Sequence, residues 1–398
     1  MVHLSPLARS VRPSATMAAA AKARELKTRG ITVFDFSLGE PDFDTPAHIC
    51  QAAAEAAQAG HTHYTPANGL LEARRAIAQW YSQFHGWNVQ PENVLISNGA
   101  KHSIHNALAA TVGPGDEVII PTPYWVSYSE LVEMLGARPV LVHTSAEDGF
   151  KMTPSQLRAA LTSRSRLVML NSPCNPTGTV YTRAEFDRLA EVILDSPLAV
   201  LSDEIYEQLT YGTAAPTCFA TLRPELAERT IVISGASKSY AMTGWRMGWA
   251  VGPKPVIDAM GNIQSQETGC PSSVSQHALI AALTGSQDCV QQMRHEFSKR
   301  RSLVIRRLRE IPKLRLVEPD GAFYAFFDVS AYFGQPLFGG PVSNSSEFCQ
   351  HALEHAHVCL VPGSAFGCEG FVRMSFATRM DIIEAGLNRL DAWLQGKL

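Results

Sequence analysis

The sequence has little excess charge, no long apolar run and no closely spaced pair of cysteines. Its 34 Lys and Arg residues against 37 Asp and Glu residues give a net charge of −3, so no overall positive field favours nucleic acid as a partner. No stretch approaches the roughly 20 apolar residues that span a bilayer, which argues against a membrane protein. The eight cysteines contain no CxxC pair, and we expect reduced thiols in a cytoplasmic protein.

Common motifs for nucleotide binding and hydrolysis are also missing. Without a GxGxxG or Walker loop, the sequence does not predict a nucleotide site. Without a GxSxG elbow, the commonest hydrolase interpretation loses its support. An HxxEH pattern does occur at His351, Glu354 and His355. No further acid is suitably placed after it, and its helix carries an ordinary apolar stripe, so we expect no metal there.

The pattern that is present predicts an α/β fold with a second, smaller domain. The chain has 398 residues, 45% of them apolar, which exceeds what one core normally organises. Unbroken apolar runs alternate with helical segments, as in a mostly parallel sheet covered on both faces. These runs are residues 94–97, 117–121, 166–170, 198–202, 230–234 and 247–252.

The character of the sequence changes after about residue 285. A long charged helix over 287–310 leads to LRLVE (314–318), then to the strand-like segments 321–329, 357–361 and 371–377, and to a closing helix over 380–395. This order favours a smaller α+β domain. We therefore predict a large domain over 46–285 and a small domain formed by both chain ends, 1–45 and 286–398.

Polar residues follow five of the predicted strands. In an open α/β sheet, ligands bind beyond the carboxyl ends of the strands, so these five segments should converge on one site. They are residues 98–101, 122–125, 171–178, 203–206 and 235–238.

Gly99, Ala100 and Lys101 open one predicted helix, and the N-terminus of a helix suits a phosphate. A glycine at this position is more often a simple cap, so the motif is weak alone. Arg246 offers a forked, charge-assisted contact to the same phosphate. A small phosphorylated cofactor fits these residues better than a nucleotide.

Asp203 follows an apolar strand and should be buried, where a carboxylate needs a cationic partner. An arginine is the ordinary structural partner. The alternative is a protonated pyridine nitrogen, which makes the ring an electron sink. Asn175 and Tyr206 then suit a phenolic oxygen on that ring, and Trp125 offers a flat face for stacking.

Lys238 lies among small residues in SGASKSYAMTGWRMG, 234–248. Lysines on solvated faces usually sit among other charges. A nucleophilic lysine must lose its proton, which desolvation or a neighbouring cation promotes by lowering its pKa. The small neighbours allow close approach of a cofactor, so we interpret Lys238 as a nucleophilic amine.

Six motifs in register resemble the pyridoxal-phosphate aminotransferases of fold type I, class I, and within them the bacterial aspartate aminotransferase branch. The resemblance runs over nearly the whole chain. It implies a large domain with a mostly parallel seven-stranded sheet covered by helices, plus a smaller α+β domain. The motifs are GEPDF (39–43), HYTPANG (63–69), NPTG (175–178), DEIY (203–206), SKSYAMTGWRMG (237–248) and FVRMSFA (371–377).

The resemblance also implies residue roles. Lys238 would hold pyridoxal 5′-phosphate and then move a proton as general acid and base, while Asp203 would pair with the pyridine nitrogen. Arg373 would clamp the substrate α-carboxylate. The other implied contacts are Asn175 and Tyr206 at the ring oxygen, Trp125 stacked on the ring, Gly99, Ala100, Lys101, Ser237 and Arg246 around the phosphate, Tyr64 reaching it from the second subunit of a homodimer, and Gly39, Trp125 and Asn175 at the substrate.

Two positions depart from the family pattern. Many relatives carry serine where this chain has Gly235, so the hydroxyl contact to phosphate is assigned to Ser237. Close relatives often carry lysine where this chain has Arg12, in VRPSATM (11–17). Arg12 and Lys101 are the two cations we consider for binding the distal carboxylate of a dicarboxylic substrate.

The function expected from the resemblance is ping-pong transfer of an amino group between an amino acid, aspartate or glutamate first, and a 2-oxo acid. Prephenate or an aromatic 2-oxo acid is the alternative acceptor. Elimination by a C–S lyase on the same scaffold is a second alternative, because the cofactor contacts are shared. A ligand-sensing domain of a regulator is a third.

Overall fold

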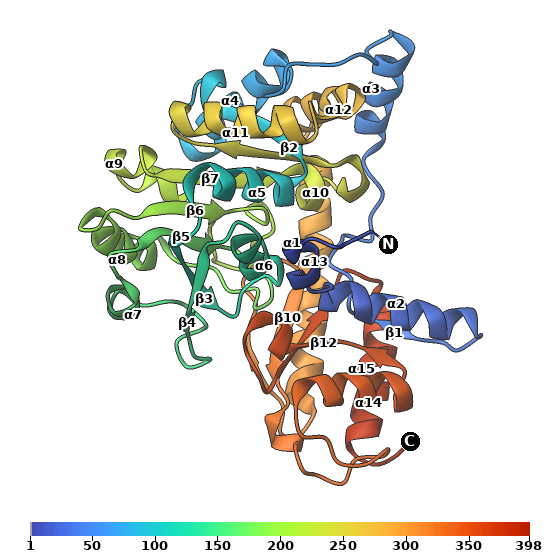
Figure 1. The fold of residues 1–398 in the computed structure, drawn as a ribbon. Helices are drawn as coiled ribbons and strands as arrows, with labels where there is room; N and C mark the ends of the chain where they lie inside the picture. Colours follow the sequence, from blue (N-terminus) through green and yellow to red (C-terminus); the bar gives the residue numbers. More distant parts are fainter. Residues whose placement is uncertain (1) are drawn as a thin grey trace.

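The computed structural model describes residues 2–398 and contains a large and a small lobe (Figure 1). The large lobe is built on a seven-stranded sheet in which only β8 runs antiparallel to its neighbours. Its strands, in order across the sheet, are β2 (Val94–Asn98), β8 (Met247–Val251), β7 (Thr230–Gly235), β6 (Ala199–Asp203), β5 (Ser165–Asn171), β3 (Glu117–Thr122) and β4 (Arg138–His143).

Helices cover both faces of this sheet because its strands are apolar on both sides. Leu167 and Met169 pack toward α5, α6 and α11, whereas Val168 and Leu170 pack toward α7 and α8. The helices of this lobe are α3 (Ala47–Gln58), α4 (Leu71–His85), α5 (Ala100–Thr111), α6 (Ser127–Met134), α7 (Pro154–Ala160), α8 (Arg183–Leu194), α9 (Pro224–Ala227), α10 (Ala236–Ser239), α11 (Lys254–Glu267) and α12 (Ser273–Thr284).

The small lobe combines the two ends of the chain. Near its N-terminus the chain forms α1 (Pro6–Ser10), α2 (Ala15–Thr28) and β1 (Phe34–Asp35), and β1 pairs in parallel with β11 (Val358–Cys359). A four-stranded antiparallel sheet has the order β12 (Val361–Pro362), β13 (Phe371–Ser375), β10 (Tyr324–Asp328), β9 (Arg315–Val317). The other helices are α13 (Asp288–Glu310), α14 (Ser345–His355) and α15 (Met380–Leu394).

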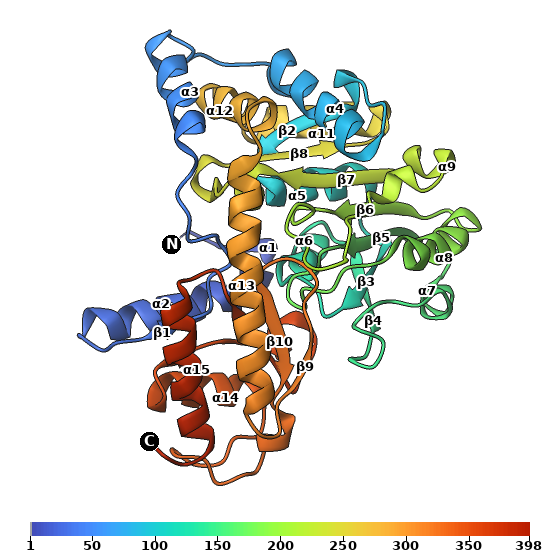
Figure 2. The same cartoon turned by 180° about the vertical axis from the view of Figure 1, so that it is seen from behind.

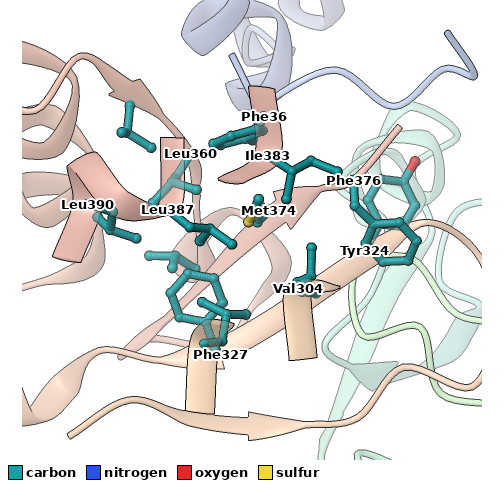
Figure 3. Packing of buried hydrophobic residues seen from close by; sticks show 14 of the residues in the cluster. Phe36, Val304, Tyr324, Phe327, Leu360, Met374, Phe376, Ile383, Leu387 and Leu390 are labelled. Atoms are coloured by element: carbon teal, nitrogen blue, oxygen red, sulfur yellow. The ribbon is translucent and has the colours of Figure 1, made fainter. Parts of the chain in front are cut away.

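Helix α13 runs from the large lobe along the small one, as Figure 2 shows from behind. Its residue Val304 packs with Met374 of β13 and Leu387 of α15 in the apolar core of the small lobe (Figure 3). The same cluster includes Phe36, from the chain just after β1, and Tyr206, from the large lobe. This core therefore lies against the edge of the large sheet where the candidate site is.

The sequence located most elements within a residue or two. The predicted helices over 287–310 and 380–395 coincide within one residue with α13 and α15. The sequence did not predict the strand β4. Its segment, RPVLVH, contains polar and exposed positions, as expected for a strand at the edge of a sheet. The single strand expected at 357–361 is divided into β11 and β12, which belong to different sheets.

Within residues 2–398, every helix is too short or too polar to cross a membrane.

Candidate functional site

A cavity of about 370 Å³ lies where the carboxyl ends of the large sheet meet the small lobe. It gathers eleven of the fourteen predicted site residues from segments far apart in the sequence. Gly99 is buried directly beside it, whereas Arg12 and Tyr64 do not line it. The eleven are Gly39, Ala100, Lys101, Trp125, Asn175, Asp203, Tyr206, Ser237, Lys238, Arg246 and, from β13, Arg373.

Lys238 lies in α10, directly after β7, and its Nζ donates a hydrogen bond of 2.7 Å to the Gly39 carbonyl. Burial lowers the pKa of this amine from 10.5 to about 8, opposed by Glu40, and the charges of Arg246 and Arg373 lower it further. A substantial fraction of the amine is therefore neutral near physiological pH. This is the state that a nucleophile requires.

Asp203 ends β6 and is 4% exposed. Its Oδ2 accepts a hydrogen bond of 2.5 Å from the Tyr128 hydroxyl, and its Oδ1 accepts one of 3.2 Å from the Ile205 amide. Burial raises the pKa of the carboxyl to about 6, despite the lowering effect of these two donors. Among residues 2–398 no arginine pairs with this buried carboxylate, which therefore suits a cationic ring atom from the cavity.

Asn171, at the end of β5, holds two neighbouring segments together. Its Nδ2 donates to the Asp203 carbonyl at 2.9 Å, and its Oδ1 accepts from the Asn175 amide at 2.9 Å. The loop that carries Asn175 is thus fixed to the strand that carries Asp203.

Gly99 and Gly248 allow two backbone segments to approach closely. Gly99 caps α5 at φ 86°, and a Cβ there would lie 2.2 Å from Arg246 Nη2. A Cβ on Gly248 would lie 2.1 Å from the Ala100 amide nitrogen. The Arg246 guanidinium is consequently held against the start of α5, where the helix dipole already favours an anion.

The departure at Gly235 has a steric reason in this chain. A Cβ on Gly235 would lie 2.9 Å from the Met247 carbonyl oxygen and 3.1 Å from Gly248 Cα. Ser237, two residues later, lines the cavity and is 7% exposed. Its hydroxyl is therefore available where a side chain at 235 would be crowded.

Arg373 is 1% exposed, and its guanidinium is only partly bonded. Nη1 donates to Asn175 Oδ1 at 2.9 Å and Nη2 donates to the Ser37 carbonyl at 2.7 Å. Nε is buried with no partner among the described residues. A buried, unpaired donor on a cation favours an anionic ligand from the cavity.

The two cations considered for a distal carboxylate lie in different places. Lys101 lines the cavity, with its Nζ 4.8 Å from the centre of the Trp125 ring. Arg12 does not line it; its side chain is 69% exposed and pairs with Glu130 at 2.7 Å and Glu133 at 3.6 Å. Residues just beyond Arg12 do reach the cavity, namely Ser14, Thr16 and Met17.

Tyr64 is 97% exposed and lies in the loop between α3 and α4. This chain alone does not bring it to the cavity.

Two other groups of titratable residues carry metal-binding atoms. His85, Glu204 and Glu207 place theirs within 4.8 Å of one another. His85 Nε2 lies 2.7 Å from Glu207 Oε2, and Glu204 Oε1 accepts from Ser202 and Phe219, so these groups already have partners. In the HxxEH segment, Glu354 pairs with Lys22 at 3.2 Å.

Sequence reasoning missed Asn171, Tyr128, Tyr324 and Ser37. Asn171 stood in a segment already singled out, at the first position after an apolar run. Tyr128 follows Trp125 by three residues and shares its face near the start of α6, a spacing that could have indicated it. Tyr324 lies in the apolar strand β10, and Ser37 lies in the chain after β1. The sequence around them contains no pattern that indicates a site.

Comparison with known proteins gives the family. The model for aminotransferase class I and II matches residues 31–390. The aspartate aminotransferase of Geobacillus stearothermophilus is 44% identical over 388 residues, 98% of each chain. An aspartate/prephenate aminotransferase of Cereibacter sphaeroides is 42% identical over 398 residues, all of both chains.

Solved structures agree with these matches. The aspartate aminotransferase of Rhizobium meliloti has a TM-score of 0.96 at 40% identity and 99% coverage of both chains. The Thermus thermophilus aspartate aminotransferase with maleate has a TM-score of 0.92 at 38% identity, covering 98% of this chain and 99% of its own. The predicted α/β fold is confirmed, and the chain belongs to the class I and II aminotransferases.

Proposed function

We propose that this chain binds pyridoxal 5′-phosphate and transfers the amino group of aspartate or glutamate to a 2-oxo acid. The observation that carries the proposal is Lys238, an amine with a pKa of about 8 in one cavity with Asp203, Arg246 and Arg373. A nucleophilic amine, a ring-pairing carboxylate and two separate anion sites are the set that a phosphorylated pyridine aldehyde and a carboxylate substrate require.

The residues present fit the cofactor. Gly99 leaves room for the Arg246 guanidinium against the start of α5, where a Cβ would fill the space. Together with Ser237, Ala100 and Lys101, this end of the cavity suits the dianionic phosphate. At the other end of the ring, Asp203 is buried without a cation of its own among the described residues.

When bound, the cofactor supplies the aldehyde that receives the amino group and the ring that draws electrons from the breaking bond. Lys238 would hold the cofactor and, as general acid and base, would move the proton that leaves the substrate Cα. Asp203 would pair with the ring nitrogen, and Asn175 and Tyr206 would bind the ring oxygen. Arg373 would bind the substrate α-carboxylate through its fork, and Trp125 would stack on the ring.

A dicarboxylic substrate is supported by two observations. Lys101 places a second cation in the wall of the cavity that Arg373 lines, and a structural relative was solved with maleate, a dicarboxylate. Prephenate is the second candidate acceptor, supported by the full-length relative named for aspartate and prephenate.

We further propose a homodimer, with Tyr64 completing the phosphate site of the second subunit. The support is the family resemblance, which assigns Tyr64 this role, and its 97% exposure in one chain, which leaves the side chain accessible to a second chain. We expect the protein in the cytoplasm.

The direct test uses purified protein loaded with pyridoxal 5′-phosphate. Adding aspartate or glutamate without an acceptor should bleach its visible absorption band, and adding 2-oxoglutarate should restore it. Persistence of the band with every proteinogenic amino acid would contradict the transfer reaction. Release of ammonia and pyruvate from cysteine conjugates would favour elimination instead. Turnover with prephenate as the amino acceptor would support prephenate as a substrate.

A further inference from the structure

Tyr324 is a buried tyrosine in a strand of aromatic residues. It is 1% exposed, and its neighbours in β10 include Phe326 and Phe327. Figure 3 shows its ring at the edge of the small-lobe core, with the hydroxyl directed away from Met374 and Ile383. The hydroxyl lies 2.8 Å from the Tyr206 hydroxyl, and Tyr324 lines the same cavity as Tyr206.

Tyr206 and Tyr324 have one hydroxyl hydrogen each, and this number decides which of them donates the hydrogen bond once a ligand is present. Each phenol has one hydrogen, and burial raises the pKa of both Tyr206 and Tyr324, so both keep it. If Tyr206 gives its hydrogen to the cofactor's ring oxygen, it has none left for Tyr324. Tyr324 must then donate to Tyr206, which strengthens Tyr206 as a donor through cooperative polarisation.

The ring of Tyr324 has a second contact. The guanidinium carbon of Arg373 lies 4.5 Å from the centre of the Tyr324 ring, and the same carbon lies 5.1 Å from the centre of the Phe366 ring. The titratable and charged groups that face the pair are Arg373 and, on the Tyr206 side, Asp203. Tyr324 also limits the position of Gly39, where a Cβ would lie 2.7 Å from the Tyr324 hydroxyl oxygen.

We propose that Tyr324 is a positioning residue for amino-group transfer and acts with both halves of its side chain. Its hydroxyl donates to Tyr206 and thereby commits the Tyr206 hydrogen to the ring oxygen of the cofactor. Its ring holds the Arg373 guanidinium in the orientation that accepts the substrate carboxylate. This proposal rests on the proposed function.

Two variants of the protein with bound pyridoxal 5′-phosphate separate the role of the Tyr324 hydroxyl from the role of its ring. Tyr324→Phe removes the hydroxyl and keeps the ring, whereas Tyr324→Leu removes both. The readouts are the apparent pKa of the visible band, from a spectroscopic pH titration, and the Kd of maleate, from its effect on that band. Tyr211→Phe is the matched control, because the Tyr211 hydroxyl donates to the Ala322 carbonyl near Tyr324 but outside the cavity.

Tyr324→Phe should raise the apparent pKa of the band by about half to one unit, the size that one neutral hydrogen bond supplies. The sign follows because a weaker donor stabilises the negative ring oxygen less. Its maleate Kd should stay near that of wild type. Tyr324→Leu should in addition weaken maleate binding by about 2- to 30-fold, the range of a cation–π contact. Tyr211→Phe should change neither readout.

A double-variant cycle tests whether the hydroxyl acts through Tyr206. In a Tyr206→Phe background, adding Tyr324→Phe should leave the pKa of the band unchanged. A shift as large as in the wild-type background, no shift in Tyr324→Phe alone, or an equal shift in Tyr211→Phe would overturn the inference. Failure of the wild-type protein to develop a visible band would instead overturn the proposed function, and this inference with it.

Discussion

The two ends of the cavity differ in how firmly they are built. At the end with Lys238, Asp203 and Arg373, two of the three side chains are at most 4% exposed, and all three have short hydrogen bonds to neighbouring segments. At the exposed end, where Ser14, Thr16 and Met17 reach the cavity, Arg12 stays outside it, with a side chain that is 69% exposed and paired with Glu130 and Glu133. The first end is preorganised by one chain alone, and the second is not.

This difference separates chemistry from specificity. Buried charges are costly unless they have partners or a ligand, so their presence after apolar strands supports the proposal that these residues bind a ligand. A solvent-exposed cation has no desolvation penalty. The position of Arg12 is therefore as compatible with a surface ion pair as with substrate binding. Variants at the two ends should therefore have effects of different kind and size.

The largest effect is expected for Lys238→Ala, at the preorganised end. Removing the nucleophile and general base should lower turnover by at least about 10³-fold. It should also remove the covalent label that borohydride fixes in wild type on the peptide containing Lys238.

Lys254→Ala is the matched control, because Lys254 is an exposed lysine paired with Asp258. It should keep both activity and label. A label that persists on the Lys238→Ala protein, or that maps to another lysine in wild type, would contradict the assignment of the nucleophile.

The next effect is a pH dependence set by burial. The rate at which protein without cofactor takes up pyridoxal 5′-phosphate should follow the neutral fraction of Lys238. With a pKa of about 8, this fraction falls about tenfold per pH unit below 8 and levels off above it. Stopped-flow measurement of the visible band from pH 6 to 10 tests this. A rate that keeps rising toward pH 10.5 would indicate an ordinary, solvated lysine.

The preorganised end was largely predictable from the sequence. Polar residues directly after apolar runs identified Asn175, Asp203 and Lys238, because the carboxyl ends of parallel strands converge at one edge of a sheet. Tyr324 could not be found this way. Its role depends on the approach of β10 in the small lobe to Tyr206 in the large lobe, a long-range contact without a local signal.

The fold was predictable where strands are buried on both faces and less so at the edges. The uninterrupted apolar runs gave six strands of the large sheet, while β4 at its edge lacks that pattern. The pairing of β1 with β11 joins the two chain ends. The domain boundaries at 45/46 and 285/286 stay a prediction, which limited proteolysis would test.

The smallest effect is expected at the exposed end, where Lys101 and Arg12 compete for the distal carboxylate. Lys101→Ala should raise KM for aspartate and 2-oxoglutarate by about 10-fold, the worth of one partly exposed charge-assisted contact. Substrates without a distal carboxylate, such as alanine or phenylalanine, should change less, because they make no such contact.

Arg12→Ala is the paired comparison. If Arg12 stays with Glu130 and Glu133 when substrate binds, this variant should change KM for all substrates equally and by less than threefold, as for an exposed ion pair. A selective loss of dicarboxylate turnover in Arg12→Ala would show that Arg12 leaves its glutamates for the substrate. The exposed end would then become ordered only when substrate binds, whereas the Lys238 end is already ordered before binding.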